Sequence, residues 1–429
     1  GIRDNNMTKW QWILLQFTRK LWFKASLIGS LGLAAALLAS QADNFTQWQP
    51  PLDMNAEAVT SLLSIMASSM LAVTTFSRSV MTSAYGAATS NVTPRATRLL
   101  MEDGTTQGVL SVFVGSFIFS MVGMIVMQAD AYDVQGRFVL FVVTVTVIAM
   151  VVTALLRWID HLTRLGRVSE TSNRVEQATE NALQLRLKTP YLGGQPRHQT
   201  QDRPADAIII RGDVTGYIQH IDMQALSECA EQCNTEIYLD VLPGNFVHEG
   251  AVLAWLDSKR DIDDPDAIAR EISRAFSIEK ERNFDQDPRF GLAVLSEIGV
   301  RALSPGVNDP GTAIDILTRN TRLLMRWSAG RKKVSEDDVQ YPRLHVYPLQ
   351  TSDLFDDAFR MIARDGAANL EVQLRLQKSL CVMTELGDDE FHDAARHQSV
   401  LAWQHAKHVM YLEDDLERLK SVCLADSDD

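Results

Sequence analysis

Hydrophobic residues are concentrated in the first 160 positions of the chain, and charged residues are concentrated in the rest. A helix needs about 20 mostly apolar residues to cross a hydrocarbon layer about 30 Å thick. Four segments meet this condition: Leu21–Ser40, Ala58–Ser77, Gly108–Met127 and Phe138–Leu156. The pattern predicts a four-helix transmembrane domain over residues 21–160. Residues 1–20 would form a short N-terminal cytoplasmic segment, whose first six residues resemble a processing remnant.

Basic residues collect on one side of the four predicted spans. Lysine and arginine near span ends are retained in the cytoplasm, so their positions predict orientation. They precede the first span, separate the second from the third and follow the fourth: Arg19, Lys20, Lys24, Arg78, Arg95, Arg98, Arg157, Arg164 and Arg167. The opposite loops carry mainly acidic residues. We therefore expect both termini and the charged remainder of the chain to lie in the cytoplasm.

Hydroxyl side chains recur along one face of the second predicted span. They are spaced by four, four, seven and four residues: Thr60, Ser64, Ser68, Thr75 and Ser79. Such a face can line a water-filled path through the membrane. It can equally allow close packing against another helix. No predicted span carries a central acid, histidine or lysine, which argues against a proton-coupled pump.

Beyond the spans, Arg157 to Lys188 is expected to form one polar helix, and with the following loop it makes a linker over residues 161–204. Residues 205–260 then alternate short apolar runs with glycine-containing corners, which predicts a small β module. Its pattern, including "PGNFVHEGAVL", resembles the barrel-sandwich fold of biotinyl and lipoyl carrier domains. Carrier chemistry needs a lysine, and none lies between Lys188 and Lys259. We therefore expect a structural or assembly module.

Helical periodicity dominates residues 261–429, which predicts a helical subdomain interrupted by one strand at 342–350. The expected helices are Asp266–Lys280, Phe290–Leu303, Thr312–Ser328, Leu354–Leu374, Gln377–Leu386 and a last one from Asp388 to Val422. The predicted fold class is thus an α-helical membrane domain followed by a cytoplasmic α+β domain.

The stretch "ALSPGVNDPGTA", residues 302–313, separates two of these helices. Aspartate is a favoured N-cap and proline a favoured first helical residue, which predicts a preorganised corner with a new helix starting at Pro310. A glutamate one turn before an arginine predicts an ion pair on the preceding helix. The corner residues are Glu297, Arg301, Ser304, Pro305, Asn308, Asp309 and Pro310. The start of the second helix is also a possible anion site.

The longer segment "DPRFGLAVLSEIGVRALSPGVNDPGTAID", behind four spans, resembles a bacterial predicted-membrane-protein family known as domain of unknown function 2254. The resemblance runs from Met7 to about Ser328. It implies a bacterial cytoplasmic (inner) membrane protein with four spans and a C-terminal domain, and it supplies no catalytic residue. The matching motif positions are Phe290, Gly291, Ala302, Leu303, Ser304, Pro305, Asn308, Asp309, Pro310 and Thr312.

Candidate chemistry is sparse in this sequence. A net charge of −13 argues against nucleic acid as a partner. No nucleophile elbow, phosphate loop or dinucleotide fingerprint occurs. Three groups contain possible metal ligands: the pair Cys229 and Cys233, the helix with Asp393, His397 and His408, and the acidic run at 261–266. Their spacings fit ordinary helix, surface and capping roles better, so we expect no metal, no cofactor and no catalytic residue.

Three interpretations of function follow. The favoured one is a homo-oligomeric channel with a cytoplasmic ring, in which the hydroxyl face of the second span lines a conduit for ions or a small solute. The second is a membrane-anchored scaffold or sensor without a pore, whose cytoplasmic domain binds a partner or small ligand near Asn308 and Asp309. The third and weakest is a membrane-bound enzyme that uses the His397 helix.

Overall fold

The structure is a computed structural model, and the continuous segments it describes are residues 55–101, 103–129, 134–197, 203–257, 264–331 and 338–423. The chain divides between Thr171 and Ser172 into two compact units. Below, the span unit denotes the described residues up to Thr171, and the C-terminal unit denotes those from Ser172 onward.

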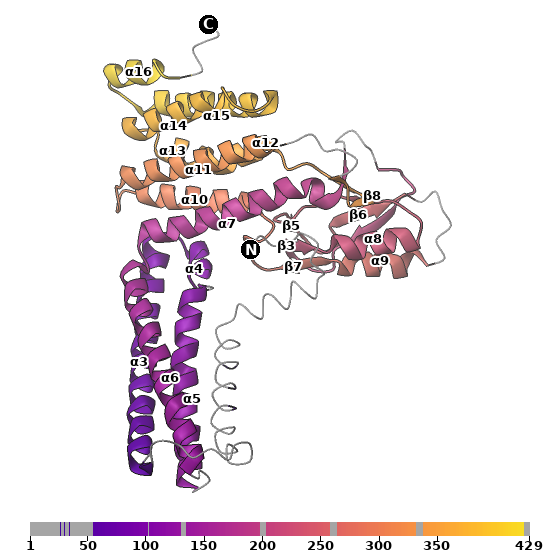
Figure 1. Ribbon diagram of the computed structural model, residues 1–429. Helices are drawn as coiled ribbons and strands as arrows, with labels where there is room; N and C mark the ends of the chain where they lie inside the picture. Colours follow the sequence, from indigo (N-terminus) through magenta and orange to yellow (C-terminus); the bar gives the residue numbers. More distant parts are fainter. Residues whose placement is uncertain are drawn as a thin grey trace. The chain divides into compact units, whose positions relative to one another are not determined.

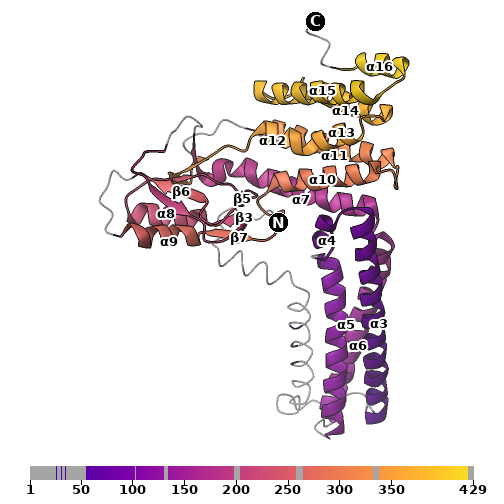
Figure 2. The same cartoon turned by 180° about the vertical axis from the view of Figure 1, so that it is seen from behind.

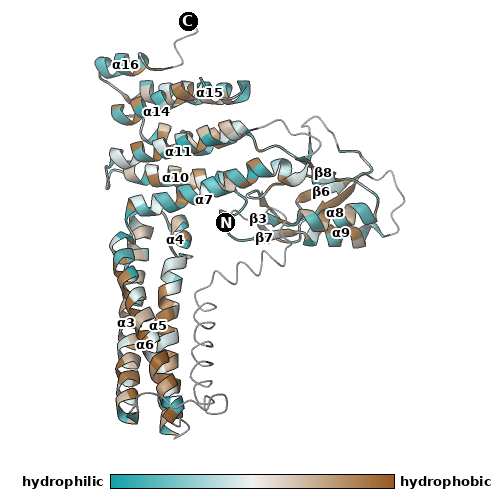
Figure 3. Cartoon of the chain, in the orientation of Figure 1, coloured by the Kyte–Doolittle hydropathy of each residue, from teal (hydrophilic) through white to brown (hydrophobic). Residues whose placement is uncertain are grey.

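Three helices of the span unit are long and apolar enough to cross a membrane: α3 (Ala56–Asn91), α5 (Gly104–Gln128) and α6 (Val134–Arg164). They run side by side in Figure 1, and Figure 3 shows their apolar colouring. Each contains one predicted span and extends beyond it at both ends. Of the first predicted span, Leu21–Ser40, only Ser26, Ser30 and Ala34 are described, so three spans are supported and the number four is not confirmed.

The interior of the span unit is filled by large side chains. Phe113, Phe119, Leu140 and Trp158 are almost fully buried among the three helices. The indole nitrogen of Trp158 on α6 donates a hydrogen bond to the Ser77 hydroxyl on α3 at 2.8 Å. Small residues of α5 are also buried, which allows neighbouring helices to approach closely: Ser111, Gly115, Ser116, Ser120 and Gly123.

The continuous polar helix predicted from Arg157 to Lys188 is wrong, because the chain breaks between α6 and α7 (Val168–Lys188). Gly166 has a φ of +81°, the left-handed conformation in which glycine commonly terminates a helix. The Leu165 amide still bonds to the His161 carbonyl at 3.1 Å, so the last turn of α6 is closed before the chain turns away.

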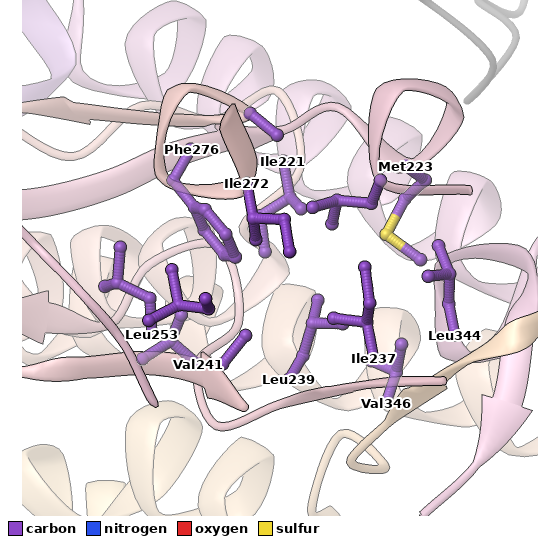
Figure 4. Close-up of a cluster of buried hydrophobic side chains, with 14 of the residues drawn as sticks. Ile221, Met223, Ile237, Leu239, Val241, Leu253, Ile272, Phe276, Leu344 and Val346 are labelled. Atoms are coloured by element: carbon purple, nitrogen blue, oxygen red, sulfur yellow. The ribbon is translucent and has the colours of Figure 1, made fainter. Parts of the chain in front are cut away.

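The β module of the C-terminal unit contains two sheets. The five-stranded sheet has the order β1-β8-β4-β6-β2, and the three-stranded sheet has the order β5-β3-β7. The strands are β1 (Gly194–Pro196), β2 (Ile208–Arg211), β3 (Gly216–Ile221), β4 (Ile237–Leu239), β5 (Phe246–Val247), β6 (Val252–Leu256), β7 (Phe276–Glu279) and β8 (Tyr341–Val346). The helices α8 (Met223–Gln232) and α9 (Pro265–Arg274) pack against them. Figure 4 shows the shared core, including Ile237, Leu253, Ile272 and Leu344.

The barrel-sandwich expectation is not confirmed. Strand β8 comes from far outside residues 205–260, and it pairs in parallel with both β1 and β4. The strand predicted at 342–350 is β8 over Tyr341–Val346, an interior strand of the larger sheet, and the prediction extends four residues too far. The predicted helix Asp266–Lys280 is also wrong at its end, because α9 stops at Arg274 and β7 pairs with β3. Burial of Phe276 in the module core favours the strand over continued helix.

The helical subdomain is a stack of helices, seen in Figure 2. It comprises α10 (Pro288–Leu303), α11 (Pro310–Gly330), α12 (Thr351–Phe355), α13 (Met361–Asp365), α14 (Leu370–Met383), α15 (Asp389–Val409) and α16 (Glu413–Lys420). Two predicted helices are divided. Leu354–Leu374 is interrupted before Asn369, whose side chain accepts a hydrogen bond from the Val372 amide at 3.1 Å and caps α14. The helix from Asp388 to Val422 is interrupted after Val409.

A π-helical turn, Asp356–Arg360, lies between α12 and α13 and is held by polar side chains from α10 and α11. The Ser296 hydroxyl lies 2.6 Å from the Asp357 carbonyl and 2.9 Å from the Ala358 carbonyl. The Asn320 amide nitrogen donates to the Ala358 carbonyl at 2.7 Å. A π turn disturbs the regular helical hydrogen bonds, and these two buried side chains compensate for that.

We predict that Ser296→Ala lowers the free energy of unfolding by about 1 to 3 kcal/mol, because it leaves a buried carbonyl without its donor. Thermal unfolding of the full chain in detergent, followed by tryptophan fluorescence, measures the loss. Ser352→Ala, at an exposed position of α12, is the matched control and should change stability by less than about 0.5 kcal/mol. Equal stability of the two variants would contradict this role for Ser296.

Candidate functional site

The hydroxyl face predicted on the second span forms part of the exposed surface of the span unit. Ser64, Ser68, Thr75 and Ser79 are exposed, and Thr60 is partly buried. The Ser68 hydroxyl donates to the Ser64 carbonyl at 2.9 Å, and the Thr75 hydroxyl donates to the Leu71 carbonyl at 2.9 Å. The protons of these two hydroxyls are thus satisfied within α3, while their oxygens remain available as acceptors.

The exposed side of α6 is different. Within the predicted span its exposed side chains are mostly large and apolar: Val139, Val142, Val145, Met150, Val152 and Leu156, with Thr146 and Thr153 also exposed. Such a surface suits contact with lipid. At the Ala56 end of α3, by contrast, a hollow of about 480 Å³ is lined partly by Glu57, Thr60, Ser61 and Ser64. Exposed hydroxyls are thus more frequent on α3 than on α6, although α3 also exposes Ile65, Leu71 and Phe76.

A buried polar cluster joins α5 to α6. Asp103 caps α5 by accepting from the Thr106 amide at 2.8 Å, and His161 Nε2 lies 3.0 Å from the same carboxylate oxygen. The Thr106 hydroxyl and His161 Nε2 are also 3.0 Å apart. The sequence reasoning missed this cluster, although an aspartate three residues before a threonine at a helix start is a recognisable capping pattern. Its evident role is to fix α6 against the start of α5.

The motif corner is built as the sequence predicted. Asp309 caps α11, accepting from the Thr312 amide at 3.1 Å and from the Thr312 hydroxyl at 2.5 Å, and Pro310 is the first helical residue. These hydrogen bonds lower the pKa of Asp309. Asn308 has a φ of +50°, and the Asp309 amide donates to the Ala302 carbonyl at 2.8 Å. The corner from Pro305 to Asp309 is exposed.

Glu297 and Arg301 lie one turn apart on α10 and are both half-buried. Their ion pair stays a prediction. Ser304 ends α10 and donates its hydroxyl proton to the Arg301 carbonyl at 2.7 Å. The corner residues therefore lie together in sequence and space, but they enclose no cavity in the part of the chain that the structure describes.

A polar cavity of about 390 Å³ lies in the C-terminal unit, where the β module meets the helical subdomain. Its wall comes from the end of α7, the loop between β4 and β5, the segment before and at the start of α10, and the connection from β8 to α12. The lining residues are Arg186, Asp240, Leu242, Pro243, Gly244, Asn245, Arg282, Asp287, Pro288, Arg289, Tyr347, Pro348, Leu349, Gln350 and Asp353. Sequence reasoning did not predict this cavity.

Most charged groups in this wall are paired. Arg282 holds Asp287 through two hydrogen bonds of 2.8 and 3.0 Å. Arg289 contacts Asp353 at 2.6 Å and, outside the wall, Asp357 at 2.6 Å. Asp240 is paired with Arg197, whose guanidinium also packs over the ring of Tyr347. These pairs form a preorganised frame.

Gly244 shows how closely this frame is packed. It has a φ of +96°, and a methyl group there would collide with the Asp287 carboxylate. Asp287 also caps α10 by accepting from the Phe290 amide at 3.0 Å. One buried carboxylate thus joins the β4–β5 loop to the start of α10.

The comparisons with known proteins identify the family. A model of the family described as predicted membrane protein (DUF2254) matches residues 18–381. The chain belongs to this family. Uncharacterized proteins of Mycobacterium bovis and Mycobacterium tuberculosis are each 28% identical to this DUF2254 protein over 249 residues, which is 54% of this chain and 45% of theirs. The match thus spans less than half the length of these curated relatives. No solved structure matches the chain.

The weaker metal candidates of this DUF2254 protein are not brought together. Asp393, His397 and His408 are exposed on α15. Among the described residues, no group of three or more histidine, cysteine, aspartate or glutamate side chains is arranged to hold a metal ion. Asp264, from the acidic run, caps α9 by accepting from the Ala267 amide at 2.9 Å. Burial, reinforced by the neighbouring Cys233, raises the pKa of the Cys229 thiol to about 12, which disfavours a reactive thiolate.

We predict that Asp309→Ala in this DUF2254 protein lowers the free energy of unfolding by about 1 kcal/mol at neutral pH, because α11 loses its cap. Asp309→Asn should lower the free energy of unfolding by less, because asparagine can also cap a helix. Because folding lowers the pKa of Asp309, its ionised form contributes stability above the ordinary carboxyl pKa, and this contribution disappears as pH falls through the folded value.

Thermal unfolding of the full chain from pH 7 downward tests this expectation. The difference between the native chain and Asp309→Asn should shrink as the solution becomes acidic. A difference that is independent of pH would show that the charge of Asp309 does not contribute.

Proposed function

We propose that this DUF2254 protein is a homo-oligomeric channel whose conduit is lined by the hydroxyl face of α3, with the C-terminal units assembled on the cytoplasmic side. The observation that carries the proposal is the contrast between the two exposed helix surfaces. On α3, Ser64, Ser68, Thr75 and Ser79 recur as exposed hydroxyls beside exposed Ile65, Leu71 and Phe76. The exposed side of α6 is mostly apolar, and Thr146 and Thr153 are its exposed hydroxyls within the predicted span.

The filled interior of the span unit supports placing the conduit between copies. Phe113, Phe119, Leu140 and Trp158 occupy the space among α3, α5 and α6. A water-filled path within these three helices would require removing such side chains from a close-packed core. A path formed by the α3 faces of several copies needs no repacking. Between Ser64 and Thr75 its lining has acceptor oxygens and no charged side chain, so this part would discriminate weakly among ions.

Ion flux through proteoliposomes tests the lining. We expect Ser68→Leu to reduce flux at least severalfold, because it places an apolar side chain on the conduit. Ser69→Leu is a matched control, since Ser69 is also exposed but is rotated by about 100° around the helix. Equal flux in the two variants would remove the hydroxyl face from the mechanism.

The subunit count of the protein in mild detergent is an independent test. The proposal requires an oligomer. A monomer, or an oligomer that passes no ions, would favour the second interpretation, in which the protein is a membrane-anchored scaffold or sensor without a pore. In an oligomer without flux, the hydroxyl face would serve close helix packing.

A further inference from the structure

One arginine in the wall of the 390 Å³ cavity makes no hydrogen bond to another described residue. Arg186, in the last turn of α7, is 5% exposed. Its Nη1 atom is enclosed and is unpaired among the described residues. Burial lowers the pKa of Arg186 to about 10, although the charge of Asp287 partly offsets this effect. The guanidinium is therefore still charged at neutral pH.

Two other buried arginines of the C-terminal unit show what a structural role requires. Arg319 is 7% exposed and contacts Asn173, Glu176 and Asp315, each at 2.7 Å. Arg197 is 4% exposed and donates to the Leu239 carbonyl and the Asp240 carboxylate. A buried charge is costly without such partners. Arg186 is equally buried, and the described residues supply no such partner for its Nη1.

A second unpaired donor lies nearby. A smaller cavity of about 110 Å³ shares Arg186, Pro348 and Leu349 with the larger one, and its wall also includes Trp327. Trp327 is 6% exposed, and its indole nitrogen is enclosed without a hydrogen-bond partner among the described residues. Arginine and tryptophan side chains donate hydrogen bonds and accept none. The missing partner must therefore be an acceptor.

The charge of the wall limits which acceptor fits. Asp240, Asp287 and Asp353 line the larger cavity, and each is already held by an arginine. These carboxylates would repel a multiply charged anion, whereas a singly charged headgroup can use the free guanidinium. The remaining wall includes Pro243, Tyr347, Pro348 and Leu349, which suit an apolar body. The volume is within the range of small-molecule sites.

We propose that these adjoining cavities bind a small organic carboxylate, whose headgroup is held by Arg186 with Trp327 as a second donor and whose body lies against the proline, leucine and tyrosine wall. This site is independent of the channel proposal, because all of its residues belong to the C-terminal unit. It also differs from the motif corner, which is exposed.

Calorimetric titration of the full chain in detergent with benzoate tests the site. We expect saturable benzoate binding, no comparable binding of benzamide, which has the same shape without the charge, and weaker binding of acetate, which lacks the body. Binding of inorganic phosphate alone would overturn the assignment to an organic carboxylate. Absence of benzoate binding would overturn it as well.

Variants connect the binding to the proposed donors. Arg186→Met should weaken benzoate binding at least about tenfold, since hydrogen bonds to charged groups are among the strongest. Trp327→Phe keeps a ring and removes the donor, so we expect a severalfold loss. Arg364→Met, at an exposed arginine of α13, is the control and should bind normally. Normal binding by Arg186→Met would contradict the proposal.

The stability of the ligand-free variants provides a readout that does not depend on binding. Because Arg186 is a buried charge without hydrogen-bond partners among the described residues, Arg186→Met should unfold at the same temperature as the native chain or a higher one. If Arg186 instead stabilised the fold, the substitution would lower the unfolding temperature, and that outcome would also count against a ligand role. Neither measurement depends on ion flux, so failure of this proposal and failure of the channel proposal can be distinguished.

Discussion

The Asp287 carboxylate is the group on which the arrangement of the C-terminal unit depends. It is almost fully buried, and a buried carboxylate is tolerated only when its oxygens are engaged. Asp287 caps α10, pairs with Arg282 through both oxygens and lies against Gly244. These contacts join the β module to the helical subdomain at one point. They also place a negative charge near Arg186, which reduces the cost of burying that guanidinium.

Local chemistry made part of this arrangement predictable. Asp-Pro pairs begin three helices, α9 at Asp264, α10 at Asp287 and α11 at Asp309, because aspartate caps the helix and proline fits its first position. The long apolar segments similarly identified α3, α5 and α6, since length and composition alone decide whether a helix can cross lipid. In each case the determining interactions lie within a few residues of one another in sequence.

The remaining features depend on partners distant in sequence. Residues 276–279 form a strand because β3 is available to pair, and β8 enters the sheet beside β4 from about 100 residues away. Without tertiary contacts, the same residues continue a helical pattern or form an isolated strand. The cavity was unpredictable for the same reason, because its wall combines four separated segments. The sequence alone indicates that Arg186 is an ordinary polar residue near the end of a surface helix. Only its burial in the structure distinguishes it from other such residues.

Both proposals rest on polar groups placed where the described part of the chain gives them no matching environment. On α3 the loss of stability is small, because the Ser68 and Thr75 hydroxyls donate hydrogen bonds to their own helix and can face either lipid or water. The polarity of that face therefore permits a conduit without requiring one. Arg186 is different, because its enclosed Nη1 has no acceptor among the described residues, and an unsatisfied buried donor is destabilising. Residues that reduce stability without a compensating structural interaction are expected at functional sites. An acceptor bound in the cavity would thus remove an energetic cost at Arg186, whereas the α3 hydroxyls carry no comparable cost.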